Sequence, residues 1–185
     1  HMDAPIHFDA RGATVDQIGL EQTMGPAIVV DVSKVAASDR DLRVGIAEFM
    51  AFEKQFGTIP QGSIVLIRTG YDRFWPDTRK YLGTDERGEA AIAKLHFPGI
   101  SQEGVRWLVE QRGIRAVGLD TASIDEGQST RFESHRFLAQ HSIPIFENLK
   151  SLDQLPPRGA FVVALPMKIE GGSGAPLRAI GWVKD

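Results

Sequence analysis

Six short apolar segments, separated by helix-like and polar stretches, constrain the fold of this chain more than any other feature. They occupy residues 26–32, 63–69, 116–119, 143–146, 160–165 and 178–183. Each segment is short and rich in β-branched or other apolar residues, which is typical of strands buried in a sheet. Because helix-like stretches lie between several of them, the pattern predicts an α/β domain with a mixed sheet and flanking helices.

Three stretches between these segments are predicted to be helices. Residues 44–56 carry apolar side chains at mostly helical spacing, and Gly57 would end that helix. Ser101 is a helix-capping residue type and would begin a helix that runs to about residue 112, before Gly113. The third helix is expected over residues 131–140, with Phe132 and Leu138 facing inward.

Composition limits the size and the chemistry of the domain. The chain has 185 residues, 42% of them hydrophobic, which fits a single compact domain over residues 1–185 with a hydrophobic core. Its net charge of −3 and lack of a long basic run argue against nucleic acid or an anionic membrane surface as a partner. The absence of cysteine excludes disulfides and thiolate ligands, so a zinc site would need histidines and carboxylates. With neither a membrane-spanning stretch nor a signal peptide in the sequence, we expect a cytoplasmic protein.

The first eight residues contain a candidate metal site. His1, Asp3 and His7 occupy odd positions, and Pro5 disfavours a helix, so an extended segment would place the three side chains on one face. The Cα atoms of His1 and Asp3 would then be ~6.6 Å apart, close enough for both side chains to bind one ion. His7 would join them only if the chain bends near Pro5, and otherwise would act beside the metal. Imidazole with carboxylate suits zinc or manganese.

Spacing alone does not separate this interpretation from a frayed terminus with incidental histidines. The dipeptide His1-Met2 is also a common remnant of tag removal, in which case His1 would be vector-derived.

Further polar residues follow predicted strands, where the active sites of α/β proteins are commonly found. Asp120, Ser123 and Asp125 come after the segment 116–119, although aspartate and serine are also ordinary turn residues. Glu147 follows residues 143–146 and would need a metal ion or an arginine as a partner if buried. A lone helical histidine such as His135 is more often structural than a ligand. The glycine-rich residues 171–174 lack nucleotide-binding spacing, which leaves a small-anion site or a tight turn between strands.

Together these stretches resemble the metal-dependent cyclase-type hydrolases, which include isatin hydrolases and bacterial kynurenine formamidases. Residues 1–8 resemble the second half of the family motif H-x-G-T-H-x-D-x-P-x-H-F. Later matches lie at residues 120–125, 127–129, 135, 147–149, 165–169, 172–174 and 176. The resemblance covers essentially the whole chain, and its two ends favour the isatin-hydrolase-like branch.

The resemblance implies a role for each matching position. His1, Asp3, His135 and Glu147 correspond to ligands of a one- or two-metal site for zinc or manganese, and His7 to an acid/base histidine beside it. The resemblance therefore favours a ligand role for His135 over the structural role that is usual for a lone helical histidine. The resemblance also implies a swivelling β/β/α domain with an active-site edge shared between subunits. Without the N-terminal strand of the family, apolar surface and unpaired edge groups would be left, so we expect a homodimer or a higher homo-oligomer that covers them.

The function implied is hydrolysis of a small cyclic or aryl amide by metal-activated water. Phe8, Phe97 and Ser123 are the candidates for substrate contact, with Trp75 as a further aromatic candidate; core packing is the alternative for the aromatic residues. Because the chain begins inside the family motif, it is expected to lack the N-terminal segment of the family. The main alternative is therefore a truncated, weakly active or inactive relative that keeps the fold and a partial metal site. A third possible function is that of a small-anion-binding module that uses residues 171–174.

Overall fold

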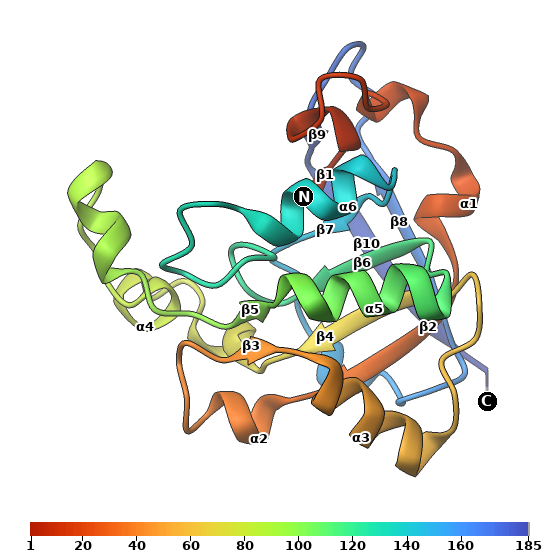
Figure 1. Cartoon of the computed structure of the whole chain (residues 1–185), viewed down its shortest axis with the longest axis horizontal. Coiled ribbons are helices and arrows are strands. Elements are labelled where there is room, and N and C mark those ends of the chain that lie inside the picture. Colours follow the sequence, from red (N-terminus) through yellow and green to blue (C-terminus); the bar gives the residue numbers. More distant parts are fainter. Residues whose placement is uncertain (185) are drawn as a thin grey trace.

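An eight-stranded mixed sheet forms the centre of the protein in a computed structural model that describes residues 1–184 (Figure 1). Its strand order is β10-β8-β2-β4-β6-β7-β1-β9. The parallel part consists of β2 (Met24–Asp31), β4 (Ile64–Arg68), β6 (Ala116–Leu119) and β7 (Ile145–Phe146). The antiparallel part consists of β8 (Ala160–Pro166) and β10 (Leu177–Val183) beyond β2, and of β1 (Met2–Asp3) and β9 (Gly174–Ala175) beyond β7.

The two edges of this sheet are joined by a single residue. β9 and β10 stand at opposite ends of the strand order, yet only Pro176 separates them in the sequence. The Met167 amide donates to the Pro176 carbonyl at 2.9 Å, which ties the end of β8 to this junction. Because consecutive strands pair with opposite edges, the sheet curves toward a closed barrel.

Both faces of the central strands are covered, which explains their continuous apolar runs. Ile28 and Val30 of β2 face a core shared with Phe49 of α3 (Ile46–Phe56) and Leu108 of α5 (Gln102–Arg112). The alternate residues Ala27 and Val29 face a second core inside the curved sheet. The helices α3, α5 and α6 (Glu133–Gln140) lie together on one side of the sheet (Figure 1).

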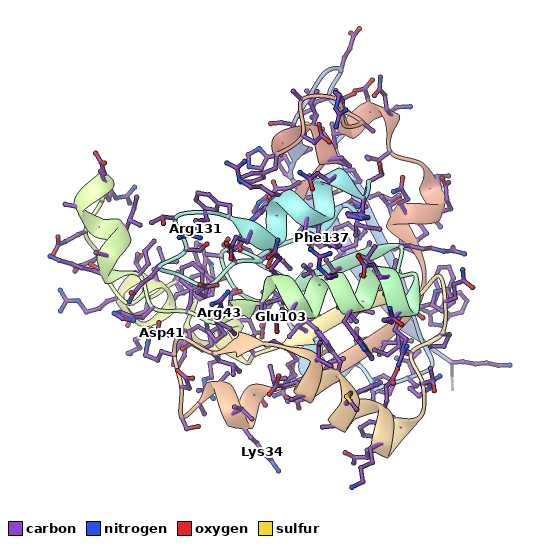
Figure 2. All side chains as sticks on the ribbon, in the orientation of Figure 1. Lys34, Asp41, Arg43, Glu103, Arg131 and Phe137 are labelled. Carbon is purple, nitrogen blue, oxygen red and sulfur yellow. The ribbon has the colours of Figure 1, made fainter. Side chains whose placement is uncertain are left out.

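An aromatic ring and a guanidinium group pack α6 against α5. Phe137 of α6 is labelled in Figure 2. The guanidinium of Arg106, on α5, lies 4.8 Å from its ring centre.

Short elements connect these parts. Five are 3₁₀ turns, at Pro5–His7, Val15–Gln17, Tyr71–Phe74, Glu89–Lys94 and Leu152–Gln154. Three are the short helices α1 (Leu20–Thr23), α2 (Ser33–Ala36) and α4 (Thr78–Leu82), and the last two are the paired strands β3 (Arg43–Val44) and β5 (Gly99–Ile100). Among the helices of residues 1–184, none combines the length and apolar character needed to cross a membrane.

The mixed sheet is confirmed, and each of the six predicted strands is present with small shifts at its ends. The helix after Ser101 is also confirmed, because the Ser101 hydroxyl accepts the Gly104 amide at 3.1 Å and Gly113 adopts a left-handed φ of 57°. Two local predictions are wrong. Residues 1–8 are extended only at β1 and then turn at Pro5, and Phe132 precedes α6 with 39% of its surface exposed instead of facing inward.

A pair of charged side chains joins α3 to the end of α5. The Glu53 carboxylate accepts Arg112 Nε at 2.6 Å, a second guanidinium nitrogen at 2.8 Å and the Ile59 amide at 2.8 Å. The hydrogen bond from Arg112 holds the pKa of Glu53 below its ordinary value of 4.5, although partial burial opposes this. A carboxylate with a lowered pKa stabilises the fold above its unfolded-state pKa, and this stability is lost as the pH falls through the folded-state value.

We therefore expect Glu53→Gln to lower the free energy of unfolding by about 2 kcal/mol at pH 7, and by much less at pH 3. Urea unfolding of both proteins across this pH range measures the difference. Glu110→Gln is the matched control, because Glu110 pairs with Arg106 at 3.4 Å on the exposed surface and should change stability little. A Glu53→Gln effect that stays constant from pH 7 to pH 3 would contradict this account.

Candidate metal centre

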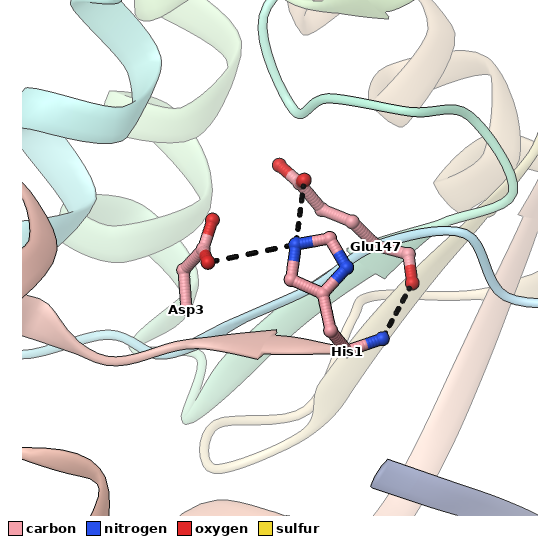
Figure 3. A group of neighbouring side chains, drawn as sticks. All are labelled: His1, Asp3 and Glu147. Atoms are coloured by element: carbon pink, nitrogen blue, oxygen red, sulfur yellow. Dashed lines mark hydrogen bonds and ion pairs between the residues drawn. The ribbon is translucent and has the colours of Figure 1, made fainter. Parts of the chain in front are cut away.

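The N-terminal strand places two side chains beside the end of β7. β1 pairs antiparallel with β7, and its ladder continues one residue further, where the Glu147 amide donates to the His1 carbonyl at 3.1 Å. As Figure 3 shows, His1 Nε2 then lies 3.5 Å from Asp3 Oδ1 and 3.3 Å from Glu147 Oε2. Possible ligand atoms of these three residues all fall within 4.8 Å of one another, a spacing that allows one ion to bind them.

A second imidazole reaches the same carboxylates from α6. His135 Nε2 lies 3.5 Å from Asp3 Oδ2 and 3.1 Å from Glu147 Oε1. Asp3, His135 and Glu147 are buried, whereas the side chain of His1 is 37% exposed. The structure thus brings His1 and Asp3 together with His135 and Glu147, which follow more than 130 residues later in the sequence.

Asp125 fixes the orientation of the His135 ring. Its Oδ2 lies 2.6 Å from His135 Nδ1 and also accepts the His135 amide at 3.1 Å, while Oδ1 accepts the Ser134 amide at 3.0 Å. Asp125 therefore caps the first turn of α6 and holds Nδ1, which directs Nε2 toward Asp3 and Glu147. Asp125 thus makes capping contacts that are ordinary for aspartate and also contacts the candidate ligand His135.

The His1 ring is held in a comparable way by residues that the sequence reasoning missed. Asn148 Nδ2 lies 3.3 Å from His1 Nδ1, and the Tyr81 hydroxyl donates to Asn148 Oδ1 at 2.9 Å. The same hydroxyl is 3.1 Å from the carbonyl of Asp120, whose buried carboxylate accepts the Thr69 and Gly70 amides. The position of Asn148 directly after Glu147 was the available signal, whereas nothing in the sequence relates Tyr81 to either residue.

The charges of this cluster are strongly coupled. Burial alone would lower the pKa of His135, but hydrogen bonds to Asp125, Asp3 and Glu147 raise it to about 11. Burial would raise the pKa of Glu147, but hydrogen bonds to His1 and His135 lower it below its ordinary range. The hydrogen bond to Glu147 raises the pKa of His1, against the effect of partial burial. Without a bound cation, a proton on His135 would therefore offset part of the negative charge of these carboxylates.

Two further predicted residues lie on the outer side of His135. The 3₁₀ turn at Pro5–His7 bends the chain, so that the His7 ring centre is 6.4 Å from that of His135 and its side chain is exposed. The Phe8 ring centre is 4.5 Å from that of His135. His7 and Phe8 thus stand beside the cluster and outside the group of four.

Other candidates lie elsewhere. Phe97 is 4% exposed within the main core, so its position supports core packing. Ser123 is half-buried, and its carbonyl accepts the Thr121 hydroxyl at 3.1 Å. Trp75 packs edge-on against Tyr81 and lines a hollow of about 260 Å³ that Asn148 also borders.

The glycine-rich segment forms a turn between strands, one of the two interpretations left open for it. Gly174, the first residue of β9, pairs with Asp3, and a Cβ atom at Gly174 would lie 2.7 Å from the Met2 carbonyl oxygen. Glycine is therefore needed where β9 approaches β1 most closely.

Comparison with known proteins adds independent information. The profile of the Cyclase family, described as "Putative cyclase", matches residues 1–126. Isatin hydrolase of Roseibium aggregatum is 30% identical over 191 residues, which cover 99% of this chain and 70% of that protein. Kynurenine formamidase of Paracidovorax citrulli is 30% identical over 180 residues, covering 97% and 73%. The structure of isatin hydrolase A from Ralstonia solanacearum matches with a TM-score of 0.89 and 37% identity, covering 99% of this chain and 70% of that one.

The coupling between Asp125 and His135 can be measured without a metal. We expect the His135 ring to stay protonated at pH 8 in the metal-free protein, and Asp125→Asn to lower its pKa because the strongest carboxylate contact is lost. Nitrogen chemical shifts of the imidazoles report both states. Asp77→Asn is the control, because Asp77 also caps a helix, at the Lys80 amide, but has no histidine partner. Titration of His135 near pH 6.5 in the parent protein would contradict the predicted network.

Proposed function

Because this chain belongs to the cyclase family of hydrolases, we propose that it hydrolyses a small cyclic or aryl amide at a metal centre formed by His1, Asp3, His135 and Glu147. The observation that carries this proposal is the convergence of two imidazole nitrogens on two buried carboxylates, with distances of 3.1–3.5 Å, from three separate segments. Isatin-like compounds, in which an aryl ring is fused to a cyclic amide, are the proposed substrate class, by analogy with the isatin hydrolases among the relatives.

The donor set fits a divalent cation. Two nitrogen donors and two carboxylates are the ligand types that zinc and manganese take in proteins. Asp3 and Glu147 are 8% and 3% exposed, and within residues 1–184 their ion-pair partners are histidines, which lose their protons when they bind a metal. When bound, zinc or manganese would lower the pKa of a water molecule and polarise the amide carbonyl.

His7 is the proposed acid/base. Its exposed ring lies 6.4 Å from that of His135, so it stands beside the carboxylate cluster without belonging to it. In this position it would take a proton from the attacking water and transfer it to the leaving amide nitrogen. Asp125 and Asn148 would keep the two ligand imidazoles oriented, and Phe8 would contact the substrate. Ser123 remains a proposed contact, whereas Phe97 is left out because it lies in the core.

The swivelling β/β/α description of the fold is part of this proposal, as is self-association. β10 is an edge strand that exposes Ile180 and Trp182 by 57% and 72%, and Phe161 on the neighbouring β8 is 39% exposed. Exposed apolar edge strands favour pairing between chains.

We expect light scattering to show a homodimer or a larger homo-oligomer. Trp182→Glu should shift the protein toward monomer, because it places a charge on this apolar edge. A parent protein that is strictly monomeric at high concentration would contradict this.

Hydrolysis by the metal-loaded protein tests the catalytic proposal. We expect added zinc or manganese to support turnover of isatin in preference to N-formylkynurenine, and a chelator to abolish it. His7→Ala should lower kcat on the order of a hundredfold or more while metal binding, measured by calorimetry, is retained. His141→Ala is the control, because His141 contacts the Phe137 carbonyl at the far end of α6.

Two results would oppose the proposal. A His7→Ala protein with full activity would remove His7 from the mechanism. Stoichiometric metal binding without turnover of either substrate would favour the alternative of an inactive family member.

A further inference from the structure

Phe132 has an unusual backbone conformation beside the proposed metal centre. It adopts φ 52° and ψ 47°, a left-handed conformation that few residues other than glycine take, in the residue before α6. Its own amide donates to the Ser129 hydroxyl at 3.2 Å, and its carbonyl accepts the Arg136 amide at 3.0 Å. Strained conformations of this kind persist where the surroundings enforce them, and they cluster at binding sites.

This conformation keeps the aromatic ring out of the core. Phe132 is 39% exposed, and within residues 1–184 neither Phe132 nor Phe8 belongs to the two buried core clusters. The Phe132 ring centre instead lies 5.4 Å from that of Phe8 and 6.0 Å from that of His135. These distances are typical of aromatic pairs, so the two phenylalanines form a continuous aromatic surface against the outer side of His135.

We propose that Phe8 and Phe132 form an aromatic wall that binds the aryl ring of the substrate, and that Phe132 determines the preference for aryl over aliphatic amides. This inference rests on the proposed function, because it assumes that the amide group is bound at the neighbouring histidines and carboxylates. A flat ring placed against two phenylalanine rings gains aromatic contacts that a saturated ring of equal size does not. No segment of the family motif contains Phe132, so its role comes from its position alone.

Binding of small carboxylates measures this preference without turnover. Benzoate and cyclohexanecarboxylate have the same charge and nearly the same size, and differ in the aromaticity of the ring. We expect the zinc-loaded protein to bind benzoate more tightly in calorimetry. Phe132→Leu should weaken benzoate binding roughly threefold to tenfold and leave cyclohexanecarboxylate almost unchanged, whereas Phe132→Tyr should retain the preference.

Phe56→Leu is the matched control, because Phe56 has a similar exposed fraction of 37% but lies at the end of α3. With isatin as substrate, Phe132→Leu should raise KM by a similar factor while kcat changes less than about twofold, as expected when only uniform binding is lost. Phe56→Leu should change neither the benzoate affinity nor KM.

Each other outcome is decisive. Equal losses for both carboxylates, equal effects of Phe132→Leu and Phe56→Leu, or no binding of either carboxylate would overturn the inference. So would a Phe132→Leu variant whose oligomeric state changes while its benzoate affinity does not, since Phe132 would then be a subunit contact. A protein that hydrolyses no amide but prefers benzoate through Phe132 would refute the proposed function and leave the aromatic wall standing. Isatin turnover with a KM that does not change in Phe132→Leu would support the proposed function and refute the aromatic wall.

Discussion

The structure depends on the pairing of a two-residue strand between two others. Met2 pairs with Phe146 of β7 on one side and with Ala175 of β9 on the other, and its side chain is fully buried. This double pairing fixes the direction in which the adjacent His1 and Asp3 side chains leave the strand. It also joins the parallel part of the sheet to the strand that returns from β8. A small number of backbone hydrogen bonds thus holds β9 on the sheet and places these side chains beside Glu147.

The same pairing imposes an electrostatic constraint. Asp3, Asp125 and Glu147 are all buried and surround a single imidazole, that of His135. Buried carboxylates are costly unless cations and hydrogen-bond donors compensate them. Within residues 1–184 this compensation comes from His1, His135 and a few backbone amides. Protons on the imidazoles and a divalent cation are alternative ways to supply the positive charge, which is why the metal proposal and the raised pKa of His135 have one cause.

The sequence predicted those parts of the fold that local patterns determine. Alternate residues of β2 face two different cores, so the strand reads as a continuous apolar run, and Ser101 and Gly113 mark the ends of α5 chemically. Phe132 could not be placed in this way. Asp125, in the loop before α6, caps this helix at the Ser134 and His135 amides, so the helix begins later than its apolar pattern indicates.

Less of the site than of the fold could be predicted from the sequence. Spacing in residues 1–8 left a metal site and a frayed terminus equally open, and only the family resemblance connected His135 and Glu147 with them. The contact between Tyr81 and Asn148 spans 67 positions and leaves no local pattern, so no reasoning from spacing finds it. The pairing of β1 with β7 rules out a frayed terminus and places His1 and Asp3 beside Glu147, whereas the metal site stays a proposal.

Pro5 explains how one short segment serves several parts of the proposed site. It starts a 3₁₀ turn in which the His7 amide donates to the Ala4 carbonyl at 2.9 Å and the Asp9 amide to the Pro5 carbonyl at 3.0 Å. Gly12 packs against this turn, where a Cβ atom would lie 2.6 Å from the Pro5 carbonyl carbon. A straight strand would carry His7 away from β7, whereas the pinned turn brings Phe8 to 4.5 Å from His135. The proposed ligand Asp3, acid/base His7 and aromatic contact Phe8 are therefore held by a strand and a braced turn, and such rigid support is what a precisely positioned site requires.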